Sequence, residues 1–134
     1  MIRYLLDTNI ISDLVRNPLG LAAQRVALLH GANICTSIIV AAELRFGVAR
    51  RGPGRVASAV EGALAQMSVL PFDEPADRAY ARIRAELEAA GRPIGGFDCL
   101  IAAHALAADC TLVTANEREF ARVPDLLIEN WLRP

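Results

Sequence analysis

The chain has 134 residues, a formal net charge of −1, 54% hydrophobic residues and only 5% aromatic ones. This length is enough for one domain, residues 1–134, with a core that needs no covalent or metal support. The near-zero charge excludes a simple basic nucleic-acid-binding protein, which would carry a clear excess of cations. All 14 basic residues are Arg, and a GC-rich coding sequence accounts for this better than phosphate recognition does.

The cysteines indicate a reducing environment. They are odd in number, lack CxxC spacing and lie in apolar runs, so we expect buried free thiols rather than a zinc site or disulfides: Cys35, Cys99 and Cys110. The start of the chain does not resemble a signal peptide, and the most apolar stretch, 94–113, is interrupted by charged residues. We therefore expect a cytoplasmic protein without a membrane segment.

Strands and helices are predicted to alternate along the chain. Short apolar runs predict strands at 2–6, 33–36, 69–72, 111–114 and 126–128. Helices are predicted at 10–16, with Thr8 or Asn9 as its cap, and then at 21–30, 38–50, 55–66, 75–90 and 97–108, the last buried on all sides. A polar turn is expected at 115–118. This order predicts an α/β fold with three layers, α/β/α, around a mostly parallel sheet.

Acidic residues follow the predicted strands. Asp7 comes directly after the first strand, Glu43 lies about two turns into the helix after the second, and Asp98 lies in the first turn of the apolar helix. Asn116, Glu117 and Glu119 follow the fourth strand. Because sites in open α/β sheets form beyond the carboxyl ends of the strands, we expect these acids to converge.

The surroundings of the acids favour a metal site. Glu43 and Asp98 lie within apolar runs with few cations nearby, so burial and mutual repulsion should raise the pKa values of their carboxyls. A divalent cation would relieve this repulsion, and oxygen ligands favour Mg²⁺ or Mn²⁺ over zinc. Structural roles remain open for two acids, because Asp7 could cap a helix and Asp98 could stabilise a helix dipole. His30 and His104 are interpreted as structural.

Several motifs resemble the PIN domain of VapC toxins, in the same order along nearly the whole chain. These are 5–9 (LLDTN), 42–47 (AELRFG), 93–105 (PIGGFDCLIAAHA), 112–120 (LVTANEREF) and 128–131 (IENW). The resemblance implies a Mg²⁺-dependent endoribonuclease that cleaves RNA, commonly tRNA. It also implies a homodimer, a cognate VapB-like antitoxin in a hetero-oligomer, and contact with DNA only through that antitoxin.

The resemblance also implies roles for individual residues. The acids of the family correspond to Asp7, Glu43 and Asp98 as metal ligands. Many PIN domains have Asp where this chain has Asn116, so Glu119 is the nearest candidate for a fourth catalytic acid. Four neighbouring polar residues are expected to form hydrogen bonds that orient these ligands: Thr8, Asn9, Thr114 and Asn116. The candidates for RNA binding are Arg45, Arg50, Arg51 and Arg55.

The turn after the fourth strand allows a sharper prediction. If Asn116 opens a helical turn, Glu119 shares its face and reaches the acidic cleft, whereas Glu117 faces solvent or pairs with Arg118. Phe120 should point into the core.

Two other functions are compatible with parts of the pattern. A phosphatase of the haloacid-dehalogenase type also begins with an Asp after the first strand, but it needs a second Asp where this chain has Asn9. A catalytically weak PIN-like module that acts with a partner in transcriptional regulation would not need to retain the acids.

Overall fold

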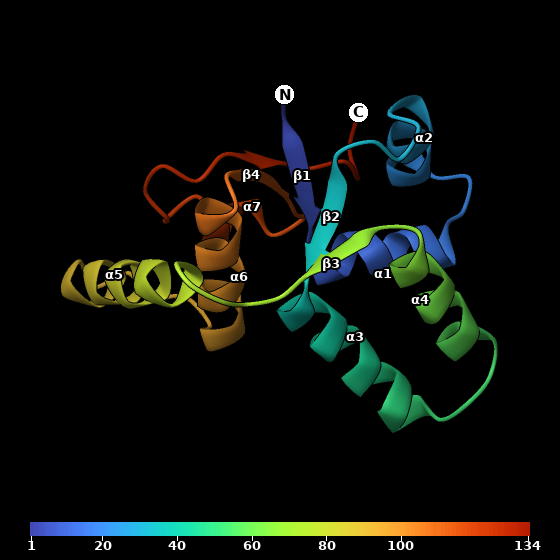
Figure 1. Ribbon diagram of the computed structural model, residues 1–134, viewed down its shortest axis with the longest axis horizontal. Helices are drawn as coiled ribbons and strands as arrows, with labels where there is room; N and C mark the ends of the chain where they lie inside the picture. Colours follow the sequence, from blue (N-terminus) through green and yellow to red (C-terminus); the bar gives the residue numbers. More distant parts are fainter.

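The computed structural model describes residues 1–134 and is built around a five-stranded sheet flanked by helices (Figure 1). The strands are β1 (Arg3–Leu6), β2 (Ile34–Ser37), β3 (Ser68–Leu70), β4 (Cys110–Val113) and β5 (Ile128–Glu129). The helices are α1 (Thr8–Arg16), α2 (Leu21–Leu28), α3 (Ile38–Arg51), α4 (Arg55–Ala65), α5 (Ala76–Ala89), α6 (Gly96–Ala107) and α7 (Glu117–Phe120). The predicted three-layer α/β fold is confirmed.

The sheet is parallel throughout, with strand order β3-β2-β1-β4-β5. β1 lies at its centre, where Leu5 and Leu6 are fully buried. Pro71 follows directly after the edge strand β3, where its missing N–H does not interrupt the pairing. Because all five strands run in the same direction, the residues after β1, β2 and β4 meet at one edge of the sheet.

The core is mainly aliphatic, as the composition predicts. Its buried aromatic residues are Tyr4, Phe120 and Trp131. Trp131 is buried and contacts the edge of the Tyr4 ring, with 5.1 Å between ring centroids. All three cysteines are buried and free, which confirms the prediction of reduced thiols. None of the helices has the length and apolar character that crossing a membrane would require.

α6 departs from its prediction as a helix buried on all sides. Its middle is buried from Ile101 to Ala105, but Phe97 in the first turn is 57% exposed.

His104 is structural, as predicted. Its Nδ1 lies 2.6 Å from Oγ of Ser37, and this oxygen also accepts a hydrogen bond from the Ile39 N–H and so caps α3. This buried contact connects α6 to the start of α3, the two helices that carry Asp98 and Glu43.

Two local predictions are wrong at helix starts. Asp7 caps α1, rather than Thr8 or Asn9, because its carboxylate accepts the Thr8 N–H and Thr8 is already helical. The expected polar turn after β4 becomes the short helix α7; Asn116 precedes it without a capping hydrogen bond from its side chain. Phe120 in α7 is fully buried, as predicted.

Candidate active site

Asp7 lies at the end of the central strand and is 4% exposed. One carboxylate oxygen, Oδ1, accepts the Thr8 N–H at 2.8 Å. The other, Oδ2, accepts the Thr114 hydroxyl at 2.8 Å and the Asn9 amide at 3.4 Å. Burial raises the pKa of Asp7 despite these hydrogen bonds. Asp7 therefore caps α1 and at the same time presents a poorly solvated carboxylate at the sheet edge.

Glu43 lies in the second turn of α3 and is half-buried. Its Oε1 accepts the Thr8 hydroxyl at 3.0 Å, so Thr8 contacts both Asp7 and Glu43. Burial raises the pKa of Glu43, and the negative charge of Asp7 adds to the effect. The structure thus brings Glu43 to the carboxyl end of β1.

Asp98 lies in the first turn of α6 and is half-buried beside the other acids. Burial raises the pKa of Asp98 to about 7, with further contributions from the carboxylates of Glu119, Asp7 and Glu43. This is the repulsion predicted for converging acids. A favourable interaction with the dipole of α6 does not prevent the rise.

Glu119 behaves differently from the other three acids. Its Oε1 accepts the Gly95 N–H at 2.7 Å and its Oε2 accepts the Asn116 amide at 2.8 Å. The hydrogen bond from Gly95 is the main cause that lowers the pKa of Glu119, in contrast to the raised pKa values of the other three acids. Glu119 shares the site with Asp98 but holds its negative charge more readily.

The four predicted supporting residues all contact the acids or one another. Asn9 Oδ1 accepts the Ala115 N–H, and Thr114 Oγ1 accepts the Asn116 N–H at 3.0 Å while donating to Asp7. The Thr114 hydroxyl therefore connects Asp7 to the turn from which α7 begins. Sequence reasoning missed Gly95, whose N–H binds Glu119; the Gly95–Gly96 pair before α6 was its only signal.

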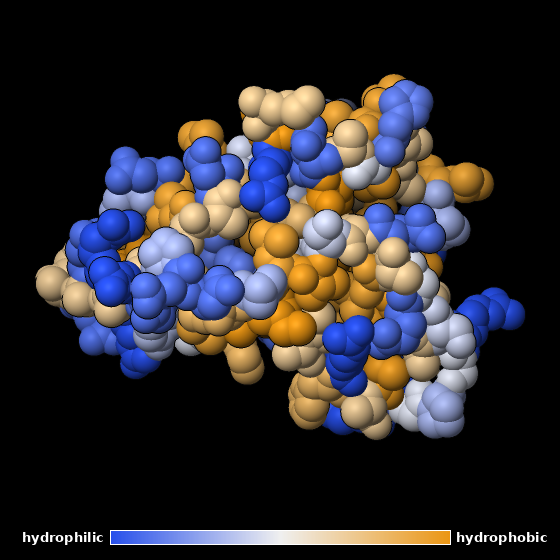
Figure 2. Space-filling model, viewed as in Figure 1, coloured by the Kyte–Doolittle hydropathy of each residue, from blue (hydrophilic) through white to orange (hydrophobic).

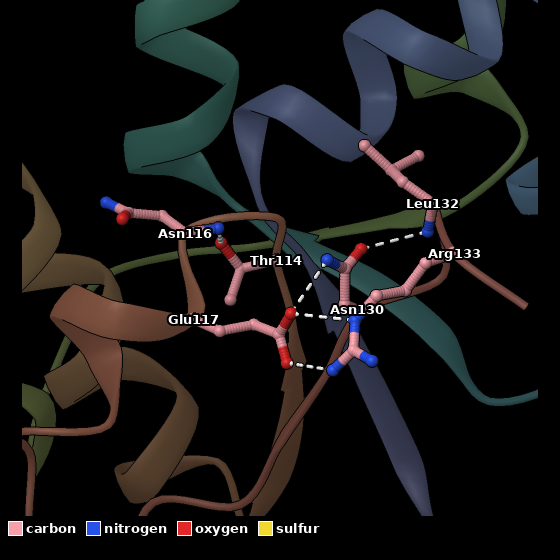
Figure 3. Close-up of polar contacts among 6 residues, drawn as sticks. All are labelled: Thr114, Asn116, Glu117, Asn130, Leu132 and Arg133. Atoms are coloured by element: carbon pink, nitrogen blue, oxygen red, sulfur yellow. Dashed lines mark hydrogen bonds and ion pairs between the residues drawn. The ribbon is translucent and has the colours of Figure 1, made fainter.

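Glu117 points toward Asn130 and Arg133 near the end of the chain (Figure 3). Its carboxylate binds the Arg133 guanidinium through two contacts of 2.7 and 3.0 Å and accepts the Asn130 amide at 3.0 Å. These hydrogen bonds lower the pKa of Glu117 to about 2. The prediction that Glu117 avoids the cleft is supported, but its partner is Arg133 rather than Arg118.

No arginine neutralises the acidic site. The five ion pairs of the chain all lie elsewhere: Arg25–Glu129, Arg45–Glu61, Arg78–Glu74, Arg84–Glu88 and Arg133–Glu117. Arg45 is therefore a poor candidate for RNA binding, because Glu61 holds its guanidinium through two contacts of 3.0 Å. Arg50 and Arg51 line a groove of about 480 Å³ that also contains Thr8 and Glu43. Arg55 is exposed and does not line this groove.

The donor set suits a hard divalent cation, because every candidate ligand is a carboxylate oxygen and no His or Cys lies among them. The side chains do not form a closed cage, since no group of three or more His, Cys, Asp or Glu residues is arranged to hold one ion. A cation bound here would therefore take part of its coordination from water, as Mg²⁺ commonly does in proteins.

The repulsion around Asp98 predicts how its removal affects stability. A carboxyl whose folded-state pKa lies above its unfolded value destabilises the fold as pH rises between the two, here between about 4 and about 7. We therefore expect Asp98→Asn to leave the metal-free protein folded and to raise its melting temperature at pH 8, by about 4 °C per kcal/mol gained. The gain should vanish near pH 4. Thermal melting in EDTA at both pH values measures it, and a variant that unfolds would instead identify Asp98 as structural.

The comparisons with known proteins agree with this geometry. The family model of the PIN domain matches residues 4–126. The tRNA(fMet)-specific endonuclease VapC of Shigella flexneri is 37% identical, over 98% of this chain and 99% of the relative. Ribonuclease VapC2 of Rickettsia felis is also 37% identical, over 96% of this chain and 97% of the relative.

Solved structures give the same result. The chain is similar in structure to a protein chain in the crystal structure of VapBC2 from Rickettsia felis bound to a DNA fragment from their promoter. The TM-score is 0.88 and the sequence identity is 37%, over 98% of this chain and 99% of the other. It is also similar to one in DNA-bound VapBC from Salmonella typhimurium, with a TM-score of 0.89, 36% identity and the same coverage. The chain therefore belongs to the PIN-domain family and, within it, to the VapC ribonucleases.

Proposed function

We propose that this chain is an endoribonuclease toxin that hydrolyses RNA, tRNA above all, with a Mg²⁺ ion bound by Asp7, Asp98 and Glu43. Mn²⁺ would replace Mg²⁺, because both accept oxygen ligands. The observation that carries the proposal is the set of poorly solvated carboxylates beyond the ends of parallel strands, without a cation to neutralise them. PIN-domain ribonucleases in general depend on a divalent metal, and the names of the relatives support tRNA as the substrate.

The residues of the site have different roles in the proposed reaction. When bound, the metal lowers the pKa of its water and offsets the negative charge that develops on the phosphate. Thr114 holds the Asp7 carboxylate in a fixed orientation, and Thr8 keeps Glu43 beside it. Glu43 orients or deprotonates the attacking water. Gly95 and Asn116 hold Glu119 as an ionised fourth acid.

The phosphatase alternative loses support at Asn9. This position would need a second acid, but the Asn9 amide instead donates to Asp7 and its carbonyl accepts the Ala115 N–H. A module without catalytic function would gain nothing from keeping four converging acids at a cost in stability.

We also propose a cognate VapB-like antitoxin as the partner, in a hetero-oligomer that contacts DNA only through the antitoxin, and a homodimer of the chain itself. Related chains occur in VapBC complexes, some of them with DNA. The surface supports protein contacts, because Figure 2 shows hydrophobic residues gathered over β3 and the start of α3, where Ile38 is 40% exposed. An antitoxin arginine placed among the acids would compete with the metal.

The metal proposal predicts a simple dependence. Purified protein should cleave a tRNA transcript with Mg²⁺ or Mn²⁺ and stop in EDTA, and the Asp98→Asn variant should be inactive although it is folded. Full cleavage in EDTA would contradict the mechanism. Melting curves of the same samples provide the control for folding.

Glu119 and Glu117 form a matched pair, since both lie in α7 but face different surroundings. We expect Glu119→Gln to lower Mg²⁺-dependent cleavage by about tenfold or more, roughly 1.4 kcal/mol of barrier. Glu117→Gln should remain near wild type, because Glu117 binds Arg133 outside the site. Cleavage rates across a Mg²⁺ titration decide the matter; equal rates for both variants would leave a three-acid site.

The toxin proposal is tested in growing cells. Expression of the chain alone should stop protein synthesis, measured by incorporation of a labelled amino acid, whereas Asp98→Asn should have no effect. Co-expression of a cognate VapB-like antitoxin should restore synthesis. Continued synthesis with the active chain would argue against a toxin.

A further inference from the structure

One face of α3 carries residues that the fold itself does not use. Counting from Glu43 in steps of three and four gives Phe46, Gly47 and Arg50, which share a helix face. Phe46 is 63% exposed, and the Arg50 guanidinium carbon lies 5.4 Å from the centre of its ring. Gly47 and Arg50 line the same groove as Glu43 and Thr8. The exposed ring therefore stands beside a groove that leads to the acidic site.

Apart from the contact between the Arg50 guanidinium and the Phe46 ring, neither packing nor ion pairing within the chain explains these residues. Phe46 belongs neither to the core cluster nor to the side chains packed against it. A Cβ added at Gly47 would meet nothing within 4 Å, so packing does not require glycine there. Arg50 and Arg51 form no ion pair, whereas Arg45 on the same helix is held by Glu61.

Single-stranded nucleic acid is commonly bound by exposed aromatic rings together with arginine side chains. This face offers the exposed ring of Phe46, two arginines without ion pairs, and a glycine between them that leaves room for a ligand. Bases stack on aromatic faces whatever their sequence, and arginine binds phosphate oxygens. Along the helix axis Phe46 lies about 4.5 Å and Arg50 about 10.5 Å from Glu43. This is the length scale of one or two nucleotides counted from the reacting phosphate.

We propose that this face of α3 binds the nucleotide adjacent to the cleaved phosphate, with its unpaired base stacked on Phe46 and the next phosphate on Arg50 and Arg51. The proposal rests on the ribonuclease function above and adds a requirement to it: the base beside the cut must be unpaired. The enzyme would then select loops and other single-stranded positions in folded RNA, because a paired base cannot reach the ring.

Stacking can be measured without cleavage. A short RNA with 2-aminopurine beside the cut site is titrated with protein in EDTA, where fluorescence quenching reports stacking of that base. Wild type and Phe46→Tyr, which keeps an aromatic ring, should quench the signal, and Phe46→Leu should not. Arg50→Gln should weaken binding, while the matched control Arg45→Gln should bind as wild type.

Cleavage with Mg²⁺ supplies the second measurement. Phe46→Leu should lower kcat/KM on RNA with an unpaired base beside the cut by about tenfold, within the range known for base stacking on aromatic side chains. When that nucleotide is abasic, wild type and Phe46→Leu should cleave at equal rates. Identical quenching and rates for Phe46→Leu and wild type would overturn the proposal.

Two further outcomes separate this inference from its alternatives. If light scattering shows that Phe46→Leu converts a dimer into a monomer while quenching persists, Phe46 is a protein contact and the inference is wrong. If wild type quenches the probe in EDTA but cleaves no RNA with Mg²⁺, the proposed ribonuclease function fails although the binding face is real.

Discussion

The hydrogen bond from Thr114 to Asp7 joins the ends of the two central strands and determines the geometry of the site. The hydroxyl that donates to Asp7 also accepts the Asn116 N–H, so it fixes the turn that begins α7. α7 carries Glu119, which in turn binds the Gly95 N–H before α6. One buried hydroxyl thereby links the central carboxylate to the segments that carry Glu119 and Asp98, whereas Thr8 links it to Glu43.

This arrangement has a cost that the rest of the molecule does not relieve. Asp7, Glu43 and Asp98 are desolvated together; the charge of Asp7 raises the pKa of Glu43, and both carboxylates raise the pKa of Asp98. The five ion pairs of the chain lie away from these acids, on the surface, where such pairs contribute little to stability. Repulsion between carboxylates at one edge of the sheet thus lowers the stability of the fold. Such a loss is common where a site is adapted to bind a cation or a substrate.

Much of this arrangement could be predicted because parallel strands end at the same sheet edge, so an acid after each strand implies a cluster. The predictions failed where the decisive partner is distant in sequence or lies in the backbone. No local pattern connects Glu117 with Arg133, and no side-chain pattern reveals that the Gly95 N–H lowers the pKa of Glu119. α7 spans only one turn, too short for hydrophobic periodicity to distinguish it from a polar turn.

The exposure of Phe97 and Phe46 marks another limit of sequence reasoning. Both residues lie in helices with many apolar neighbours, and periodicity assigns such residues to a core. Whether a face is covered depends on which helices pack against it, and α3 contacts α1, α4 and α6 but leaves Phe46 open. The arginines raise the same difficulty, because only the packed structure shows that Arg45 forms an ion pair with Glu61 and that Arg50 forms none.

The position of β1 has a consequence for synthesis of the protein on the ribosome. β1 precedes the other strands in the sequence, and one of its two partners in the sheet, β4, follows more than 100 residues later, with Arg3 opposite Cys110. Asp7 therefore lacks its hydrogen-bond partner Thr114 until β4 has been synthesised. The segments that carry Asp98 and Glu119 also follow Asp7 by about 90 residues or more. A nascent chain cannot assemble the catalytic edge until most of it has been translated. The acidic site therefore forms only after β4 has paired with β1, so folding across this long sequence separation has to precede any cleavage.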